Sequence, residues 1–169
     1  NTAEEQFKNL LHVLDRYVDY NIIFTYPNSD NGGVVVRRMI DDFVSHRNNC
    51  LAIASLGRDR FYSVLDNVDI MIGNSSSGLV EAPLFGIPTL NIGDRQKGRK
   101  RGCTVVDCRP EVFDIESKIQ KALSPSFRKL CGKCDNPYYK KGTADSIFRV
   151  LKSFPLTGLI KKSFYDLQY

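Results

Sequence analysis

The sequence lacks any run of consecutive apolar residues long enough to cross a membrane, which would need about 18 of them. It also lacks internal repeats, low-complexity tracts and blocks of like charge. With 42% hydrophobic and 11% aromatic residues, the chain has enough apolar side chains for a packed core. A membrane helix, a collagen-like fibre and a disordered chain are therefore excluded, and 169 residues suit one compact domain.

The cysteines are odd in number and scattered, and we expect no signal peptide before them, which argues against a disulfide framework. They are Cys50, Cys103, Cys108, Cys131 and Cys134. We therefore expect a reducing, cytoplasmic setting. Cys131-Gly132-Lys133-Cys134 is a lone CxxC motif without a second pair, so we predict ordinary thiols there and no metal site.

The charge balance is modestly basic, since 24 Lys and Arg residues against 19 Asp and Glu residues give a net charge of +5. Phosphate groups on a ligand are a sufficient explanation of this excess. The Arg95–Arg101 loop contains no aromatic residue, which argues against nucleic acid as a partner. The chain begins at Asn1 without an initiator Met, so we expect it to be a segment of a longer protein.

Short apolar runs alternate with amphipathic helical patterns along the chain. Strands are predicted over residues 22–26, 51–54, 69–73, 88–92 and 103–106, and helices from the N-terminus to Val18 and over 34–46, 61–68, 76–85, 111–123, 143–154 and 156–167. This alternation predicts an α/β fold with a Rossmann-like parallel sheet and flanking helices. The last predicted helix, over about 156–169, carries a wide apolar stripe that would dock on its own sheet or on a missing domain.

A phosphate site is predicted where the strand over 69–73 leads into the next helix. The segment Gly73–Pro83 contains small residues, which let backbone N–H groups approach an anion, and three serine hydroxyls. Glu81 follows at a distance that suits hydrogen bonds from ribose hydroxyls. The alternative is a capped, Gly-rich turn with a solvated Glu81.

A second loop, Gly93–Gly102, follows the next strand and carries five cations between glycines. Arg95 and Arg99 offer planar guanidinium groups that suit phosphate oxygens. A run of charge is often only a solvated surface. Because the carboxyl ends of parallel strands share one edge of a sheet, the two loops together favour a nucleotide diphosphate.

Several segments together resemble the hydrolysing UDP-N-acetylglucosamine 2-epimerases of sialic acid biosynthesis. They are Gly73-Asn74-Ser75-Ser76-Ser77-Gly78 with Glu81-Ala82-Pro83, Phe85-Gly86-Ile87-Pro88-Thr89, Asn91-Ile92-Gly93-Asp94-Arg95-Gln96-Lys97-Gly98-Arg99, Tyr26-Pro27-Asn28-Ser29-Asp30 and Asn136-Pro137-Tyr138. The resemblance covers most of the chain. It implies the C-terminal half of a glycosyltransferase-B-type fold, in which two Rossmann-like domains face each other across a cleft. The chain departs from the family pattern at Tyr139-Lys140-Lys141-Gly142, where a smaller Gly- and Asp-containing turn is expected.

The resemblance also implies which residues bind the ligand. Ser75 and Ser76 would hold the UDP diphosphate, Glu81 the ribose hydroxyls and Arg95 another part of the nucleotide. Asn28 would face the same cleft and the backbone near Leu56 would meet the uracil, with Ser77, Gln96 and Arg99 close by. No catalytic residue is expected in this chain, because the family's proton-moving carboxylates lie on the N-terminal domain. His12 and His46 are predicted to be surface residues.

The family's reaction eliminates UDP from UDP-N-acetylglucosamine and then adds water to give N-acetylmannosamine. This segment alone is expected to be inactive, and its partners would be UDP, UDP-N-acetylglucosamine, its own N-terminal domain and further copies in a homo-oligomer. No cofactor, nucleic acid or membrane is expected. The alternatives are a 2-epimerase of a UDP-diacetamido sugar, a nucleotide-sugar transferase of similar architecture and a non-catalytic UDP-sugar sensor.

Overall fold

The computed structural model describes residues 2–27, 32–158 and 160–161. The chain divides into two compact units, residues 1–138 and residues 139–169. The first unit contains the sheets and most of the helices. In its described residues, the second contains one helix, α7 (Thr143–Ser153), none of whose residues is buried.

The elements of the first unit alternate as the sequence predicts. The strands are β1 (Ile22–Thr25), β2 (Cys50–Ile53), β3 (Met71–Gly73), β4 (Thr89–Ile92) and β5 (Val105–Cys108), and the helices are α1 (Ala3–Leu14), α2 (Gly33–Ser45), α3 (Gly57–Leu65), α4 (Ser77–Val80), the 3-10 helix η1 (Ala82–Phe85), α5 (Val112–Leu123) and α6 (Pro125–Cys131). Among the described residues, no helix is both long and apolar enough to cross a membrane.

All strand pairs are parallel. β1 pairs with β2, and β4 lies between β3 and β5, with Met71 opposite Thr89 and Thr89 opposite Val105. The sequence predicts one sheet, whereas backbone ladders in the described part of the chain form two. β3 contains only three residues, which leaves little backbone to extend a ladder to a further strand.

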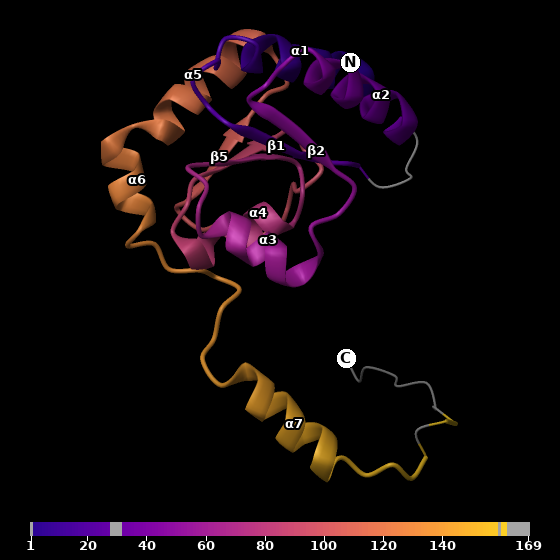
Figure 1. Cartoon of the computed structure of the whole chain (residues 1–169). Coiled ribbons are helices and arrows are strands. Elements are labelled where there is room, and N and C mark those ends of the chain that lie inside the picture. The colour runs from indigo at the N-terminus through magenta and orange to yellow at the C-terminus, as the bar shows by residue number, and fades with distance from the viewer. Residues whose placement is uncertain (1, 28–31, 159, 162–169) are drawn as a thin grey trace, which may run out of the picture. The chain divides into compact units, whose positions relative to one another are not determined.

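Helices cover both faces of the strands (Figure 1). α1 packs against α2 and α5, and these three helices lie on one side, whereas α3 and α4 lie on the other. One apolar cluster joins α1, α2 and α5 to β1, β4 and β5, and includes Val13, Ile40, Leu90 and Ile115. This cluster spans both sheets, so the helices on this side pack across the two.

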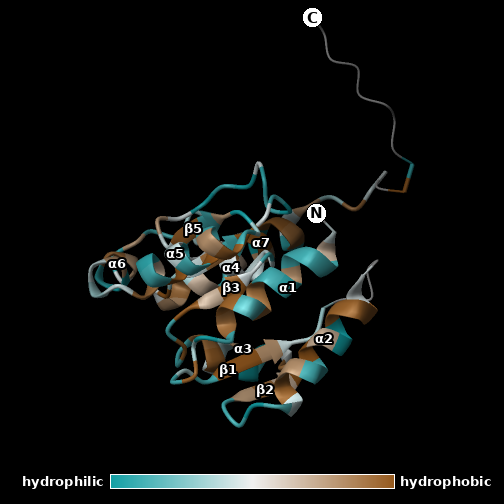
Figure 2. Cartoon of the chain, turned by 90° about the horizontal axis from the view of Figure 1, so that it is seen from above, coloured by the Kyte–Doolittle hydropathy of each residue, from teal (hydrophilic) through white to brown (hydrophobic). Residues whose placement is uncertain are grey.

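The helices of the first unit are amphipathic, as their periodicity predicts. In Figure 2, α2 carries both brown and teal residues, and Ile40 on its apolar face is only 2% exposed. A second, smaller cluster of Leu65, Ala82 and Ile87 joins α3 to η1. η1 thus packs on α3, whereas α4 packs on β3 and β4 of the sheet.

The helices differ from the prediction in three places. The helix expected over 76–85 is divided at Glu81, because Pro83 has no N–H to donate to an α-helical bond. α6 was not predicted, although Ser124 caps its N-terminus and Pro125 occupies its first turn. The helix expected over 156–167 is wrong as far as the chain is described there, since residues 156–158 and 160–161 are not helical.

Candidate functional site

The predicted phosphate loop leaves β3 at Gly73, whose φ of +148° lies in the region that favours glycine. Ser75 then forms a turn, in which its hydroxyl accepts from the Ser77 N–H at 3.3 Å and its carbonyl accepts from the Gly78 N–H at 3.2 Å. This turn leads directly into α4. The loop therefore has a defined backbone at the carboxyl end of β3.

Gly78 brings α4 against the sheet. The Thr89 hydroxyl on β4 donates to the Gly78 carbonyl at 2.9 Å, and a Cβ placed on Gly78 would lie 2.5 Å from Thr89 Cγ2. Gly78 and Thr89 are both buried. Only a residue without a side chain fits here, which places the loop over the ends of β3 and β4.

Donors in this loop are available for a ligand. Within the described chain, the N–H groups of Ser75 and Ser76 and the hydroxyls of Ser76 and Ser77 make no hydrogen bond. Ser75 is exposed, whereas Ser76 and Ser77 are half-buried. Because α4 is a single turn, its dipole is smaller than that of the longer helix predicted, so these individual donors carry most of the anion-binding capacity.

Gln96 ties the basic loop to the phosphate loop. Its Nε2 donates to the carbonyl of Asn74 at 2.7 Å, and the residue is only 4% exposed. Its buried Oε1 has no hydrogen-bond partner among the residues that the structure describes. The structure thus brings the two predicted loops together through Gln96, and direct contact of Gln96 with UDP remains a prediction.

Arg101 holds the basic loop on the sheet. Its guanidinium pairs with Asp107 of β5 at 2.9–3.0 Å and donates to the carbonyls of Arg99 at 2.8 Å and Gln96 at 3.3 Å. Asp107 also accepts from buried Asn91 of β4 at 2.7 Å. Arg101 is one of the five cations that the sequence places in this loop, and its contacts show a structural role. Arg95, Lys97, Arg99 and Lys100 are exposed.

Replacing Arg101 with alanine is therefore expected to loosen the loop without unfolding the protein. The N–H groups of Lys97 and Arg99, which donate to Asp94 and Gln96 inside the loop, should exchange with solvent faster. Amide hydrogen exchange measures this effect. The matched control is Lys97→Ala, which removes an exposed charge from the same loop and should leave the Arg99 amide unchanged. Equal exchange of that amide in both variants would contradict the role assigned to Arg101.

Glu81 lies at the C-terminal end of α4, where the chain passes into η1. Its side chain is half-buried, and none of the described residues donates a hydrogen bond to its carboxylate. The prediction of a continuous helix around Glu81 is wrong, because Pro83 breaks it. A half-buried carboxylate without an internal donor can accept hydrogen bonds from ligand hydroxyls.

The segment Asn136-Pro137-Tyr138 contacts both loops. Asn136 Nδ2 donates to the carbonyl of Val80 at the end of α4, at 2.8 Å, and the Tyr138 hydroxyl donates to the carbonyl of Lys100 at 3.1 Å. Asn136 also accepts from the Tyr138 N–H at 2.9 Å. This segment carries part of the resemblance, and the structure shows that it fastens the site.

Two predicted nucleotide contacts, Leu56 and Asn28, come from other parts of the sequence. Leu56 is half-buried at the N-terminus of α3, after β2, and no hydrogen bond in the described chain joins it to the serine loop. Asn28 lies outside the described residues. The chain before it is anchored on α2, because the Tyr26 hydroxyl donates to Asp41 and the Arg37 guanidinium lies 4.6 Å from the Tyr26 ring centre. The bond to Asp41 raises the pKa of Tyr26.

A hollow of about 610 Å³ lies beside the basic loop, at the carboxyl ends of β4 and β5. Its lining includes Gly93, Asp94, Asp107, Arg109 and Lys118. The serines of the phosphate loop and Glu81 are not part of this lining. The hollow therefore neighbours the candidate site on the same edge of the sheet without containing its anion donors.

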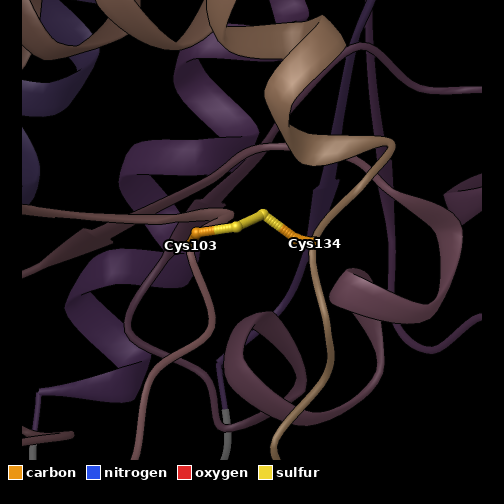
Figure 3. The surroundings of a disulfide bond; sticks show 2 residues. All are labelled: Cys103 and Cys134. Atoms are coloured by element: carbon orange, nitrogen blue, oxygen red, sulfur yellow. A yellow bond between two sulfur atoms is a disulfide. The ribbon is translucent and has the colours of Figure 1, made fainter.

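The prediction for the histidines is confirmed, whereas the prediction for two of the cysteines is wrong. His12 and His46 are exposed, as expected. The expectation of unpaired thiols is wrong for Cys103 and Cys134, which form a disulfide (Figure 3). Because these residues are 31 positions apart, spacing alone gave no signal for their pairing. The cysteines therefore no longer support the inference that the protein works in a reducing compartment.

Cys50, Cys108 and Cys131 are free thiols. Burial, with a smaller contribution from Asp114, raises the pKa of Cys108 to about 12, so this thiol stays protonated and unreactive at neutral pH. In the part of the chain that the structure describes, no cluster of His, Cys, Asp and Glu has a metal-binding arrangement.

A family model described as UDP-N-acetylglucosamine 2-epimerase matches residues 1–152, which include both loops of the candidate site. The chain belongs to this family. Two curated relatives extend the match. One is the GDP/UDP-N,N'-diacetylbacillosamine 2-epimerase (hydrolyzing) of Campylobacter jejuni, which is 32% identical over 167 residues and covers 98% of this chain and 43% of the relative.

The second curated relative is the UDP-N,N'-diacetylbacillosamine 2-epimerase (hydrolyzing) of Legionella pneumophila, which is 36% identical to this chain over 139 residues. That match covers 82% of this chain and 36% of the relative. Among solved structures, the UDP-GlcNAc 2-epimerase of Neisseria meningitidis bound to UDP-GlcNAc has a TM-score of 0.66 and 19% identity, covering 89% of this chain and 41% of that one. The chain thus has the fold of one part of these glycosyltransferase-B-like structures and spans less than half the length of these relatives.

Proposed function

We propose that residues 1–169 are the C-terminal, UDP-binding domain of a hydrolysing UDP-N-acetylglucosamine 2-epimerase. The reaction would convert UDP-N-acetylglucosamine and water to N-acetylmannosamine and UDP. The observation that carries this proposal is the serine loop at the end of β3, which has unpaired hydrogen-bond donors. Gln96 joins this loop to the basic loop, and the chain is a member of this family. Two loops of this kind suit a diphosphate.

In this proposal, donors of Ser75 and Ser76, assisted by Arg95, bind the diphosphate, and Glu81 accepts hydrogen bonds from the ribose. As the bond between C1 of the sugar and the diphosphate breaks, negative charge grows on UDP. Donors fixed in advance stabilise that charge without reorganising, which lowers the barrier to elimination. The backbone near Leu56 would meet the uracil, and Asn28, Ser77, Gln96 and Arg99 would complete the surroundings.

The carboxylates that move protons would belong to the N-terminal domain of the same protein, so this chain alone should not turn over substrate. The proposal requires no cofactor and no metal ion, because serine donors and cations take the role of charge neutralisation. We further propose that the protein is cytoplasmic and forms a homo-oligomer.

A second candidate substrate is a UDP sugar with two acetamido groups. The names of the two curated relatives favour it, because both are diacetylbacillosamine 2-epimerases described as hydrolysing. Both candidates share elimination of UDP followed by addition of water. The UDP-binding role of this chain is the same in either case.

Calorimetric titration of this chain with UDP tests the binding role. We expect weak binding, because a cleft with one wall buries only part of its ligand, and weaker binding still of UMP, which lacks the second phosphate. Equal binding of UDP and UMP, or no binding of UDP, would contradict the proposal.

Product analysis on a protein that joins this chain to its N-terminal domain tests the reaction. Free UDP with N-acetylmannosamine from UDP-N-acetylglucosamine is the expected result. An intact UDP sugar inverted at C2 would exclude hydrolysis. Turnover of only the diacetamido sugar would select the second candidate, and sugar transfer to an acceptor would select a transferase.

A further inference from the structure

The segment Cys134–Tyr138 forms a strap between the two loops of the candidate site. Besides the bonds of Asn136 and Tyr138, its backbone passes close to Gly102, the last residue of the basic loop. A Cβ on Gly102 would lie 3.3 Å from the carbonyl oxygen of Asp135 and 3.4 Å from Pro137 Cδ. The strap is therefore packed on the end of the loop as well as hydrogen-bonded to it.

The disulfide joins this strap to the chain immediately after the basic loop. Cys103 follows Gly102, and its Cα lies 5.8 Å from that of Cys134 (Figure 3), within the range that disulfides span. The covalent bond and the bond from Tyr138 to Lys100 therefore restrain the same loop from one strap. The bond from Asn136 to Val80 fixes the strap on α4.

The positions of the cysteines suit reversible chemistry. Cys103 is exposed and Cys134 is half-buried, so a small thiol can reach the bond. Cys131 is the third thiol nearby in sequence, but it is 1% exposed, and burial raises its pKa. Because a thiolate is the attacking species in exchange, Cys131 is a poor competitor for Cys134.

We propose that the Cys103–Cys134 disulfide is a reversible clamp that fixes residues 93–102 against α4 and that its reduction weakens binding of a nucleoside diphosphate. This inference rests on the proposed UDP site. A dithiol reductant would attack one sulfur to form a mixed disulfide and release the other as a thiolate. Its second thiol would then close the reductant's own disulfide and release the second cysteine, with two electrons coming from the reductant.

The size of the effect follows from what survives reduction. Asn136 and Tyr138 keep their hydrogen bonds, so the loop should remain in place part of the time. Binding must then also order the loop, and ordering a few side chains corresponds to a loss of affinity of roughly threefold to tenfold. If the protein works where thiols are mostly reduced, such a bond would sense oxidation.

The first experiment counts thiols and measures UDP affinity. Three free thiols are expected in the denatured, unreduced chain and five after reduction. Calorimetry should show weaker UDP binding after dithiothreitol treatment, and Cys103→Ser should bind weakly with no further response to the reductant. Cys50→Ser is the matched control, because Cys50 is free, and it should respond as the wild type does. Five thiols before reduction, or unchanged UDP affinity, would overturn the clamp.

The second experiment needs no ligand. The loop offers trypsin five cleavage sites between Arg95 and Arg101, and reduction should speed cleavage there in the wild type but not in Cys103→Ser. Cleavage that is equally fast in both redox states would overturn the restraint. No UDP binding in either state would overturn the proposed function instead, while faster cleavage on reduction would still support the restraint of the loop.

Discussion

Replacing Gly78 with alanine is expected to destabilise the protein by about 1–3 kcal/mol, the usual cost of an added methyl in a packed core. The new Cβ would lie 2.5 Å from Thr89 Cγ2, so α4 or β4 must shift. Alanine favours helices over glycine by only about 1 kcal/mol, and α4 is a single turn, so the clash should dominate. Urea denaturation measures the change.

Two further variants make this prediction specific. Gly132→Ala is the matched control, because its Cβ would meet only ordinary contacts at 3.9–4.0 Å and its φ of −64° suits alanine. Adding Thr89→Ser to Gly78→Ala should recover part of the stability, since serine lacks Cγ2 but keeps the hydroxyl that donates to the Gly78 carbonyl. Strictly additive effects of the two substitutions would contradict direct contact as the cause.

Glu81→Gln is expected to weaken UDP binding by roughly tenfold or more, because hydrogen bonds to a charged group are stronger than those to a neutral one. The stability of the protein should hardly change, since none of the described residues donates to this carboxylate. Calorimetric titration with UDP measures the affinity, and urea denaturation checks the fold.

The control for Glu81 is Glu4→Gln, which removes the same charge from an exposed position in α1. It should leave UDP affinity unchanged, which separates a contact with the ribose from a change in net charge. If Glu81→Gln bound UDP as tightly as the wild type, or if both variants lost affinity equally, the role assigned to Glu81 would be wrong.

The sequence predicted the alternation of strands and helices well, because the periodicity of apolar residues reflects which side chains are buried in the first unit. It failed where another constraint decides the backbone. Pro83 divides the helix after β3, and Pro155 ends α7 because it disfavours helical backbone at Phe154. Residues 156–158 are not helical despite their apolar stripe. Ser124-Pro125 was a readable start signal for α6.

The sequence predicted the two loops of the candidate site but not the roles of its cations and cysteines. Arg101 is identical in type to Arg95 and Arg99, and only the position of Asp107 on β5 turns it inward. Pairing of Cys103 with Cys134 likewise depends on where α6 delivers the chain. Such roles follow from tertiary neighbours, which sequence periodicity does not encode.

The contacts that hold the site span long stretches of chain, which bears on the order of folding. Asn136 and Val80 are 56 positions apart, and Tyr138 and Lys100 are 38 apart. Contacts between distant residues form late, because closing the loop between them costs entropy before the contacts contribute any stabilising free energy. During synthesis from the N-terminus, a chain that has reached Gly102 already contains every residue that we expect to touch UDP. It should acquire affinity for UDP only after the segment up to Tyr138 has emerged.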